Sequence, residues 1–138
     1  MKIKKELTHK FYQNLGKLFY AIAAIDNNVR DEELDKLKDV VKKEWLTTNL
    51  IECSLKTDIE HSIINTFKWL HNDNNYNAET CYNSFLTFKK EHESLFTNDI
   101  NTLILKTARA LATAFSKVNK SELIILAKLN MELKKNKL

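Results

Sequence analysis

The chain of 138 residues contains no proline and a single glycine, Gly16. Tight turns usually need glycine for a positive φ or proline for a fixed φ. A β-sandwich or a meander of short strands needs many such turns. The composition therefore favours long helices joined by polar connections, in which asparagine is the main turn residue.

Apolar residues recur at steps of three and four along six segments, which is the period of one helix face. The stripes are Phe11, Leu15, Leu18, Ile22 and Ile25; Leu34, Leu37, Val41 and Trp45; Ile59, Ile63, Phe67 and Leu70; Cys81, Phe85 and Phe88; Leu103, Thr107, Ala110, Leu111 and Ala114; and the run LIILAKL near the end. The length and the 43% hydrophobic content suit one core. We expect a compact all-α domain over residues 1–138, with six to seven helices.

Polar residues at the ends of these stripes predict the helix boundaries. The first helix is expected from Lys5 to Ile25 and the second from Asp31 to Trp45. The expected starts of later helices are a Thr57-x-x-Glu60 capping box, a Thr97 cap and an Asn119-x-x-Glu122 capping box, with a polar break over HNDNNYN, His71 to Asn77. Because LIILAKL is apolar around most of its circumference, the last helix is expected to be the most buried.

The chain also repeats itself. Residues 15–37, LGKLFYAIAAIDNNVRDEELDKL, align without a gap on residues 104–126, ILKTARALATAFSKVNKSELIIL. Alanine, lysine, valine, glutamate and leucine recur at matching positions, including Glu33 with Glu122. The repeat predicts two pseudo-symmetric helical hairpins, related by a pseudo-twofold and packed around the middle helices.

The bend of the first hairpin gathers polar side chains in the stretch AIDNNVRDEELDKL. Asp26, Asn28 and Glu33 offer carboxylate and amide oxygens, which are the ligands that calcium and magnesium prefer. Carboxylates in the first turn of a helix are equally expected as partners of its free N–H groups, where each stabilises by about 0.3 to 1 kcal/mol. The residues alone leave both a cation site and a plain helix cap open.

The stretch AIAAIDNNVRDEELDKL resembles the signature hairpin of the tellurite-resistance TerB family, which reads A-x-A-D-G-x-(I/V)-x-x-x-E. The segments FKKEHESLF and KSELIILAKL lie where such proteins carry their second half. The resemblance implies an all-helical fold with internal duplication and a divalent-cation site at the acidic bends. It also implies a role in cytoplasmic stress complexes near the membrane.

The resemblance assigns cation ligands at the first bend only. Asp26 and Glu33 match the acidic pair of the family, with Asn28 between them, and Asn27 replaces the usual glycine. In the second hairpin Glu122 matches, but Phe115 stands where the aspartate belongs. Phenylalanine offers no ligand atom, so we expect calcium or magnesium only at Asp26, Asn28 and Glu33.

The sequence gives little indication of a zinc site, a phosphate-binding loop or a catalytic cysteine. His9, His61, His71 and His92 lack zinc-site spacing, and a single glycine makes no phosphate-binding loop. The two cysteines, Cys53 and Cys81, are expected to be reduced thiols, with no partner spaced for nucleophilic catalysis. The larger aromatic residues, Trp45, Trp69, Phe67 and Phe88, are expected in the core. Tyr76 in the Asn-rich connection is expected to contact a partner or to cover the core.

Charge and hydropathy exclude several partners. The net charge is +4, but the lysine excess gathers at the two ends, MKIKKEL and LKKNKL. Such ends favour solvated termini over a nucleic-acid surface. No apolar run approaches the roughly 18 residues of a membrane span. We expect a cytoplasmic monomer or weak dimer without nucleic acid.

Two functions are compatible with the sequence. The favoured one is a non-enzymatic, TerB-like cation-binding interaction module with an unidentified protein partner, in a stress or tellurite-resistance complex. The alternative is a metal-free helical adaptor whose acidic bend is only a cap. An enzyme ranks below both, because the sequence offers no convergent acid, base and nucleophile.

Overall fold

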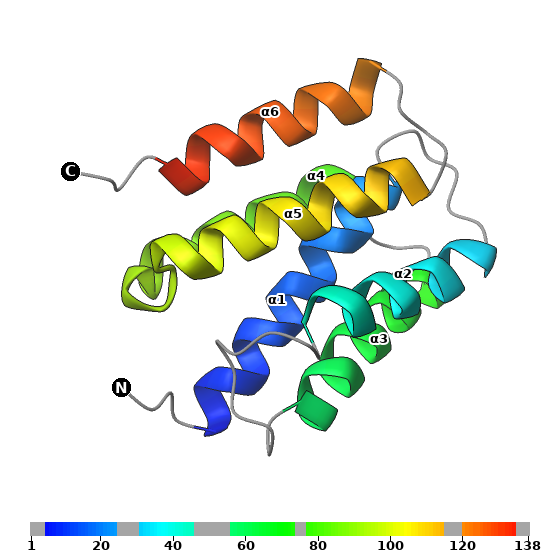
Figure 1. Cartoon of the computed structure of the whole chain (residues 1–138), viewed down its shortest axis with the longest axis horizontal. Helices are drawn as coiled ribbons and strands as arrows, with labels where there is room; N and C mark the ends of the chain where they lie inside the picture. Colours follow the sequence, from blue (N-terminus) through cyan, green and yellow to red (C-terminus); the bar gives the residue numbers. More distant parts are fainter. Residues whose placement is uncertain (1–4, 25–30, 46–55, 74–76, 115–119, 135–138) are drawn as a thin grey trace.

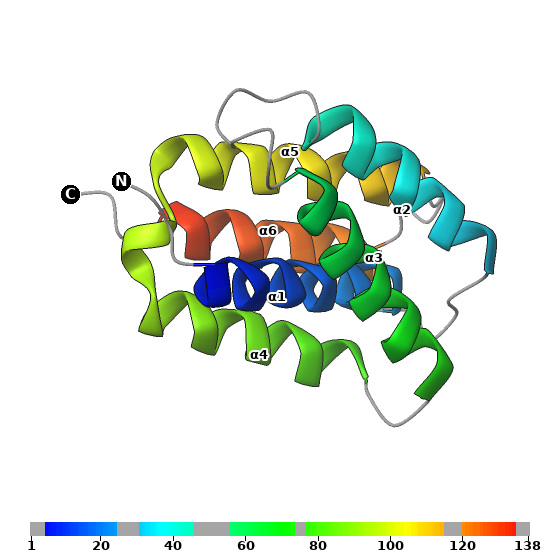
Figure 2. The ribbon, with the colours of Figure 1, turned by 90° about the horizontal axis from the view of Figure 1, so that it is seen from below.

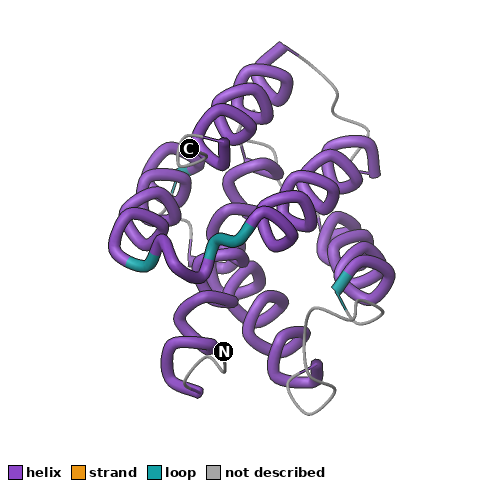
Figure 3. The backbone as a smooth tube through the Cα atoms, turned by 60° about the vertical axis from the view of Figure 1, so that its left-hand side comes forward, coloured by secondary structure: helices purple, strands orange, loops and turns teal. Residues whose placement is uncertain are grey.

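The computed structural model describes residues 5–24, 31–45, 56–73, 77–114 and 120–134. Its helices are α1 (Lys5–Ala24), α2 (Asp31–Glu44), α3 (Lys56–Asp73), α4 (Ala78–Glu91), α5 (Asn98–Ala114) and α6 (Lys120–Lys134). A short 3-10 helix, η2 (Glu93–Leu95), lies between α4 and α5. The described residues contain no strand, as Figure 3 shows, so the all-α prediction of six to seven helices is confirmed.

Helix α1 is the centre of the fold. It packs most extensively against α3 and α4 and also contacts α5 and α6 (Figures 1 and 2). Every residue from Leu18 to Ala24 is buried. A helix that is apolar all round belongs in the interior, and the last two turns of α1 meet that description.

An aromatic cluster around Phe11 joins α1 to the ends of three other elements. The ring of Phe11 lies 6.5 Å from that of Trp45, 6.3 Å from Phe88 and 5.5 Å from Phe96, measured between centroids. Trp45 follows α2, Phe88 is on α4, and Phe96 precedes α5. Each buried aromatic side chain stabilises the fold by about 1.5 to 3 kcal/mol, so the cluster fixes the mutual positions of these helix ends.

The single glycine allows α1 and α3 to approach closely. A Cβ atom at Gly16 would lie 2.8 Å from Cβ of Thr66 and 2.9 Å from the carbonyl oxygen of Ile63. Real Cβ atoms almost never come so near to such neighbours. Gly16 is therefore needed for the packing of two helices and not for a turn.

The structure confirms some of the predicted caps and breaks and corrects others. The helix start predicted at Thr57 is wrong, because α3 begins at Lys56 and includes Thr57. Asn77 caps α4 by accepting a hydrogen bond from the backbone N–H of Thr80 at 2.8 Å. Thr97 caps α5 as predicted, because its hydroxyl accepts from the N–H of Ile100 at 3.2 Å. The polar break predicted from His71 is wrong at its start, since α3 continues to Asp73. His71 is half-buried there, and tertiary contact overrides its weak helix propensity.

The two halves of the repeat share helix starts and buried positions. Asp31 and Lys120, which the internal alignment equates, are the first residues of α2 and α6. The equivalent pairs Leu15 and Ile104, Leu18 and Thr107, Ile22 and Leu111, and Ala23 and Ala112 are all buried. The packing differs, because α5 and α6 are antiparallel neighbours, whereas α2 packs mainly on α5 and α3 (Figure 1). Superposition about a pseudo-twofold stays a prediction.

Helix α6 is not the most buried element, so that prediction was wrong. Ile124 and Met131 are exposed on it by 47% and 71%. The helix lies at the periphery, where α5 and, to a smaller extent, α1 are its main contacts. Its apolar residues therefore form two faces, one toward the core and one outward. Within the described ranges, no helix combines the length and hydrophobicity needed to cross a membrane.

Candidate functional site

Of the acidic bend, the structure describes only the residues that belong to α2. Glu33 lies in the first turn of α2, and its side chain is 1% exposed. Asp26 and Asn28 lie outside the described residues. Of the predicted metal ligands, the structure therefore places Glu33 alone. The second bend is described still less, because Phe115 and the side chain of Glu122 also fall outside.

Glu33 faces the interior of the molecule. It precedes Leu37 and Val41 by one and two steps of four residues, and all three are buried on one face of α2. Its neighbour Glu32 is exposed. A carboxylate that only caps a helix has no need to face the core, and glutamate is almost never fully buried unless it is compensated. The burial thus separates Glu33 from the exposed carboxylates Glu32, Asp35 and Asp39 of this helix, while Glu44 at the other end of α2 is buried beside Lys106.

The residues that the structure describes do not form a metal-binding cluster among themselves. No three histidine, cysteine, aspartate or glutamate side chains gather there in a way that could hold an ion. The histidines are among the residues that do not cluster, and Nδ1 of His9 lies 3.2 Å from the hydroxyl of Ser62 instead. Any cation at the first bend thus requires ligands from residues 25–30 in addition to Glu33.

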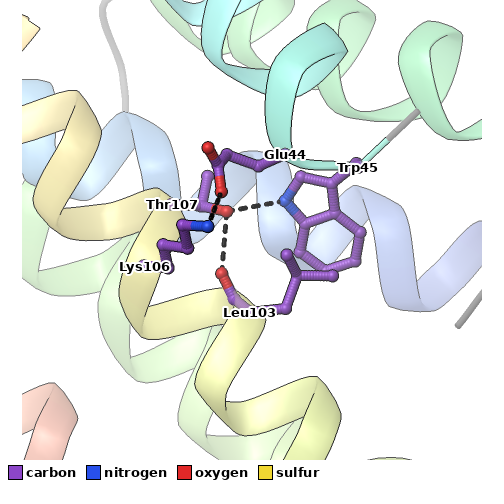
Figure 4. A network of polar contacts seen from close by, with 5 residues as sticks. All are labelled: Glu44, Trp45, Leu103, Lys106 and Thr107. Atoms are coloured by element: carbon purple, nitrogen blue, oxygen red, sulfur yellow. Dashed lines mark hydrogen bonds and ion pairs between the residues drawn. The ribbon is translucent and has the colours of Figure 1, made fainter. Parts of the chain in front are cut away.

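A buried polar network links the end of α2 to α5 (Figure 4). The indole Nε1 of Trp45 donates to the hydroxyl of Thr107 at 2.8 Å, and this hydroxyl donates to the carbonyl oxygen of Leu103 at 2.8 Å. Beside it, the carboxylate of Glu44 lies 3.2 Å from Nζ of Lys106. The network satisfies the polar end of a fully buried tryptophan, so its role is to position α2 on α5.

A second polar seam runs between α1 and α4. Nζ of Lys17 donates to the hydroxyl of Ser84 at 3.1 Å, and this hydroxyl lies 3.5 Å from Oδ1 of Asn14. Cys81 is buried nearby. Burial raises the pKa of its thiol to about 11, although the positive charge of Lys17 acts in the opposite direction. The thiolate is the nucleophilic form, and the raised pKa keeps Cys81 in its thiol form at neutral pH.

A groove of about 410 Å³ lies between α4 and α6. It is lined by Ala78, Glu79, Tyr82, Asn83, Ile124, Ile125 and Lys128. The hydroxyl of Tyr82 is buried without a hydrogen-bond partner among the described residues. Burial, together with the negative charge of Glu132, raises the pKa of Tyr82 to about 12. The groove combines an apolar wall, two opposite charges and an unsatisfied hydroxyl.

A smaller groove of about 330 Å³ lies between α1 and α3. Its lining residues are Gln13, Lys17, Asn65, Thr66 and Trp69. Trp69 is 51% exposed, so its predicted place in the core was wrong, while Trp45, Phe67 and Phe88 are buried as predicted. The apolar stripe of α3, formed by Ile63, Phe67 and Leu70, is buried, and α3 packs on α1. Trp69 lies outside that stripe.

Sequence reasoning missed the groove between α4 and α6. A signal was present, because a helix that carries apolar residues on every side has more apolar surface than one core can cover. The sequence cannot show which side remains outward, since that depends on the packing of α5 and α1. Cys53 and Tyr76 lie outside the described residues.

Comparisons with protein-family models, with curated proteins and with solved structures found no match to this chain. The TerB resemblance therefore stays a prediction that rests on the residues quoted for it.

Proposed function

We propose that this chain is a non-enzymatic, TerB-like helical interaction module whose first bend binds a divalent cation, calcium or magnesium, through Asp26, Asn28 and Glu33. The observation that carries the proposal is the burial of Glu33. A glutamate with 1% exposure sits directly after a bend rich in oxygen ligands. A cation there contacts the Glu33 carboxylate and joins the end of α1 to the start of α2.

The proposal gives the ion a structural task. Helix α2 packs on α3 and α5 but shares few contacts with α1. A cation held by residues of the bend and by Glu33 stabilises one angle between α1 and α2, because its ligands come from both sides of the connection. We propose that this angle controls a surface for a protein partner, in a cytoplasmic stress or tellurite-resistance complex of the kind that the resemblance implies.

A metal-free adaptor is the second candidate, and one observation favours it. Glu33 is in the first turn of α2, where exposed N–H groups and the helix dipole stabilise a carboxylate without any ion. In this reading the chain still binds a protein partner, but no cation changes its stability or its shape.

Titration calorimetry with calcium, magnesium and manganese chloride tests the proposal. The wild-type chain is expected to bind one ion per molecule. Asp26→Asn and Glu33→Gln keep the shape of each side chain and remove one charge, so each is expected to weaken binding by tenfold or more, about 1.4 kcal/mol. Glu32→Gln is the matched control, because it removes an exposed carboxylate from the same turn.

The outcomes separate the two candidates. Binding that is lost in Asp26→Asn and Glu33→Gln and kept in Glu32→Gln supports the cation site. Absence of binding in the wild-type chain, or equal weakening in all three variants, rejects it in favour of the metal-free adaptor.

A further inference from the structure

The outward face of α6 carries apolar side chains that no other described residue covers. Among the described residues, the exposed large hydrophobic side chains are Trp69, Ile124 and Met131, and two of these three lie on α6. Ile124 and Met131 are two helical turns apart, so they lie on the same face. Ile124 also lines the groove between α4 and α6, which makes groove and helix face one continuous surface.

The charges of this surface come from Glu79 and Lys128. Glu79 lies in the first turn of α4, and Lys128 lies across the groove on α6. Neither side chain forms an ion pair with another described residue. The buried hydroxyl of Tyr82 also has no hydrogen-bond partner among them. A surface with one carboxylate, one ammonium group and an apolar ridge is complementary to a surface of the same kind.

We propose that this surface binds a second copy of the chain, with the two α6 helices antiparallel and each lying in the groove of the other. Ile124 and Met131 are equally far in sequence from the Ala127–Lys128 pair. An antiparallel arrangement centred there places Ile124 of each copy against Met131 of the other. The small side chain of Ala127 at the centre allows the two helices to approach closely.

The same arrangement pairs Lys128 of each copy with Glu79 of the other. Lys128 on each α6 enters the groove of the other copy, where Glu79 lines the opposite wall. Twofold symmetry makes this contact twice, as in any interface that uses one patch on both subunits. A helix laid in an apolar groove, with anchors spaced seven residues apart, is a common mode of protein recognition.

The contact of one helix and one groove lies at the small end of specific interfaces. We therefore expect a dissociation constant between about 10 µM and 1 mM. Sedimentation velocity at protein concentrations up to about 1 mM is expected to show a reversible monomer–dimer equilibrium. This dimer does not depend on a cation at the first bend.

Charge reversal tests the pairing directly. Lys128→Glu alone and Glu79→Lys alone each create two repulsive contacts per dimer, so each is expected to weaken association by about tenfold or more. An equimolar mixture of the two variants is expected to recover it, because both contacts in the mixed dimer again join opposite charges. Lys68→Glu, an exposed position on α3, is the control and is expected to leave association unchanged.

The apolar contact has its own test. Ile124→Glu and Met131→Glu are expected to abolish the dimer, with circular dichroism melts showing that both variants stay folded. A wild-type chain that is monomeric at about 1 mM overturns the proposal and leaves the groove to another partner. A dimer that survives Ile124→Glu, or a mixture of the charge variants that associates no better than either alone, overturns it as well.

Discussion

The indole nitrogen of Trp45 and the hydroxyl of Thr107 form a hydrogen bond of 2.8 Å in the interior of the molecule. The two residues are 62 positions apart in the chain. Trp45 follows the last residue of α2, and Thr107 lies in the middle of α5. The bond therefore fixes where α2 ends against α5, and it does so at a fully buried side chain.

Removal of the Thr107 hydroxyl is expected to destabilise the fold. Thr107→Val keeps the shape of the side chain but leaves the Trp45 N–H buried without an acceptor, which costs about 1 to 3 kcal/mol. Urea unfolding measures the loss. Thr102→Val is the matched control, because its hydroxyl also donates to a carbonyl four residues back, at 2.8 Å, but is exposed. Equal effects of the two substitutions would show that the tertiary hydrogen bond contributes nothing.

Gly16→Ala is expected to lower stability, although alanine is the better helix former by about 1 kcal/mol. The new methyl group meets Thr66 and the backbone of Ile63, and overpacking of this kind costs about 1 to 3 kcal/mol. The thermal midpoint should fall, by roughly 2 to 8 °C for each kcal/mol lost. A rise in the midpoint would mean that α1 and α3 separate easily at this point.

Alkaline pH is expected to weaken the fold partly through Cys81. Burial raises the pKa of its thiol from 9.0 to about 11, so the folded chain holds this proton more tightly than the unfolded chain. The resulting stabilisation is complete below about pH 9 and is lost as the pH rises toward about 11. Tyr82, whose pKa is raised from 10.0 to about 12, acts in the same direction at higher pH.

The share of Cys81 is measured by comparison with Cys81→Ala. Urea midpoints of both chains are determined at about pH 8 and about pH 10.5. The wild-type chain is expected to lose more stability between these two values than the variant, because only the wild type has the buried thiol to ionise. An identical loss in both chains would place the alkaline sensitivity elsewhere.

The helices could be predicted from the sequence because their apolar stripes are long and regular. The stripe through Leu37 and Val41 and the cap at Thr97 act within one helix, where spacing alone determines which side chains meet. What was missed depends on contacts between helices. Trp69 and Ile124 are apolar residues left outside, and no local pattern distinguishes them from the buried residues beside them.

The candidate site could also be predicted only in part, because its geometry depends on contacts between helices. The sequence indicates that Glu33 follows an acidic bend, but it does not show that Glu33 turns inward while Glu32 turns outward. That difference comes from the angle at which α2 lies on α3 and α5. The groove between α4 and α6 depends in the same way on packing, since Glu79 and Lys128 are far apart in the chain.

Thermal melts with and without divalent ions test the central claim, that the first bend alone binds a cation. An ion that binds only the folded chain stabilises it by about 2.7 kcal/mol at a hundredfold excess over its dissociation constant. The midpoint of the wild-type chain should therefore rise in millimolar calcium, magnesium or manganese, and that of Glu122→Ala should rise equally from its own ion-free value. Asp26→Asn and Glu33→Gln should show no rise. A wild-type midpoint that none of the three ions changes would contradict the account and leave the acidic bend as a helix cap.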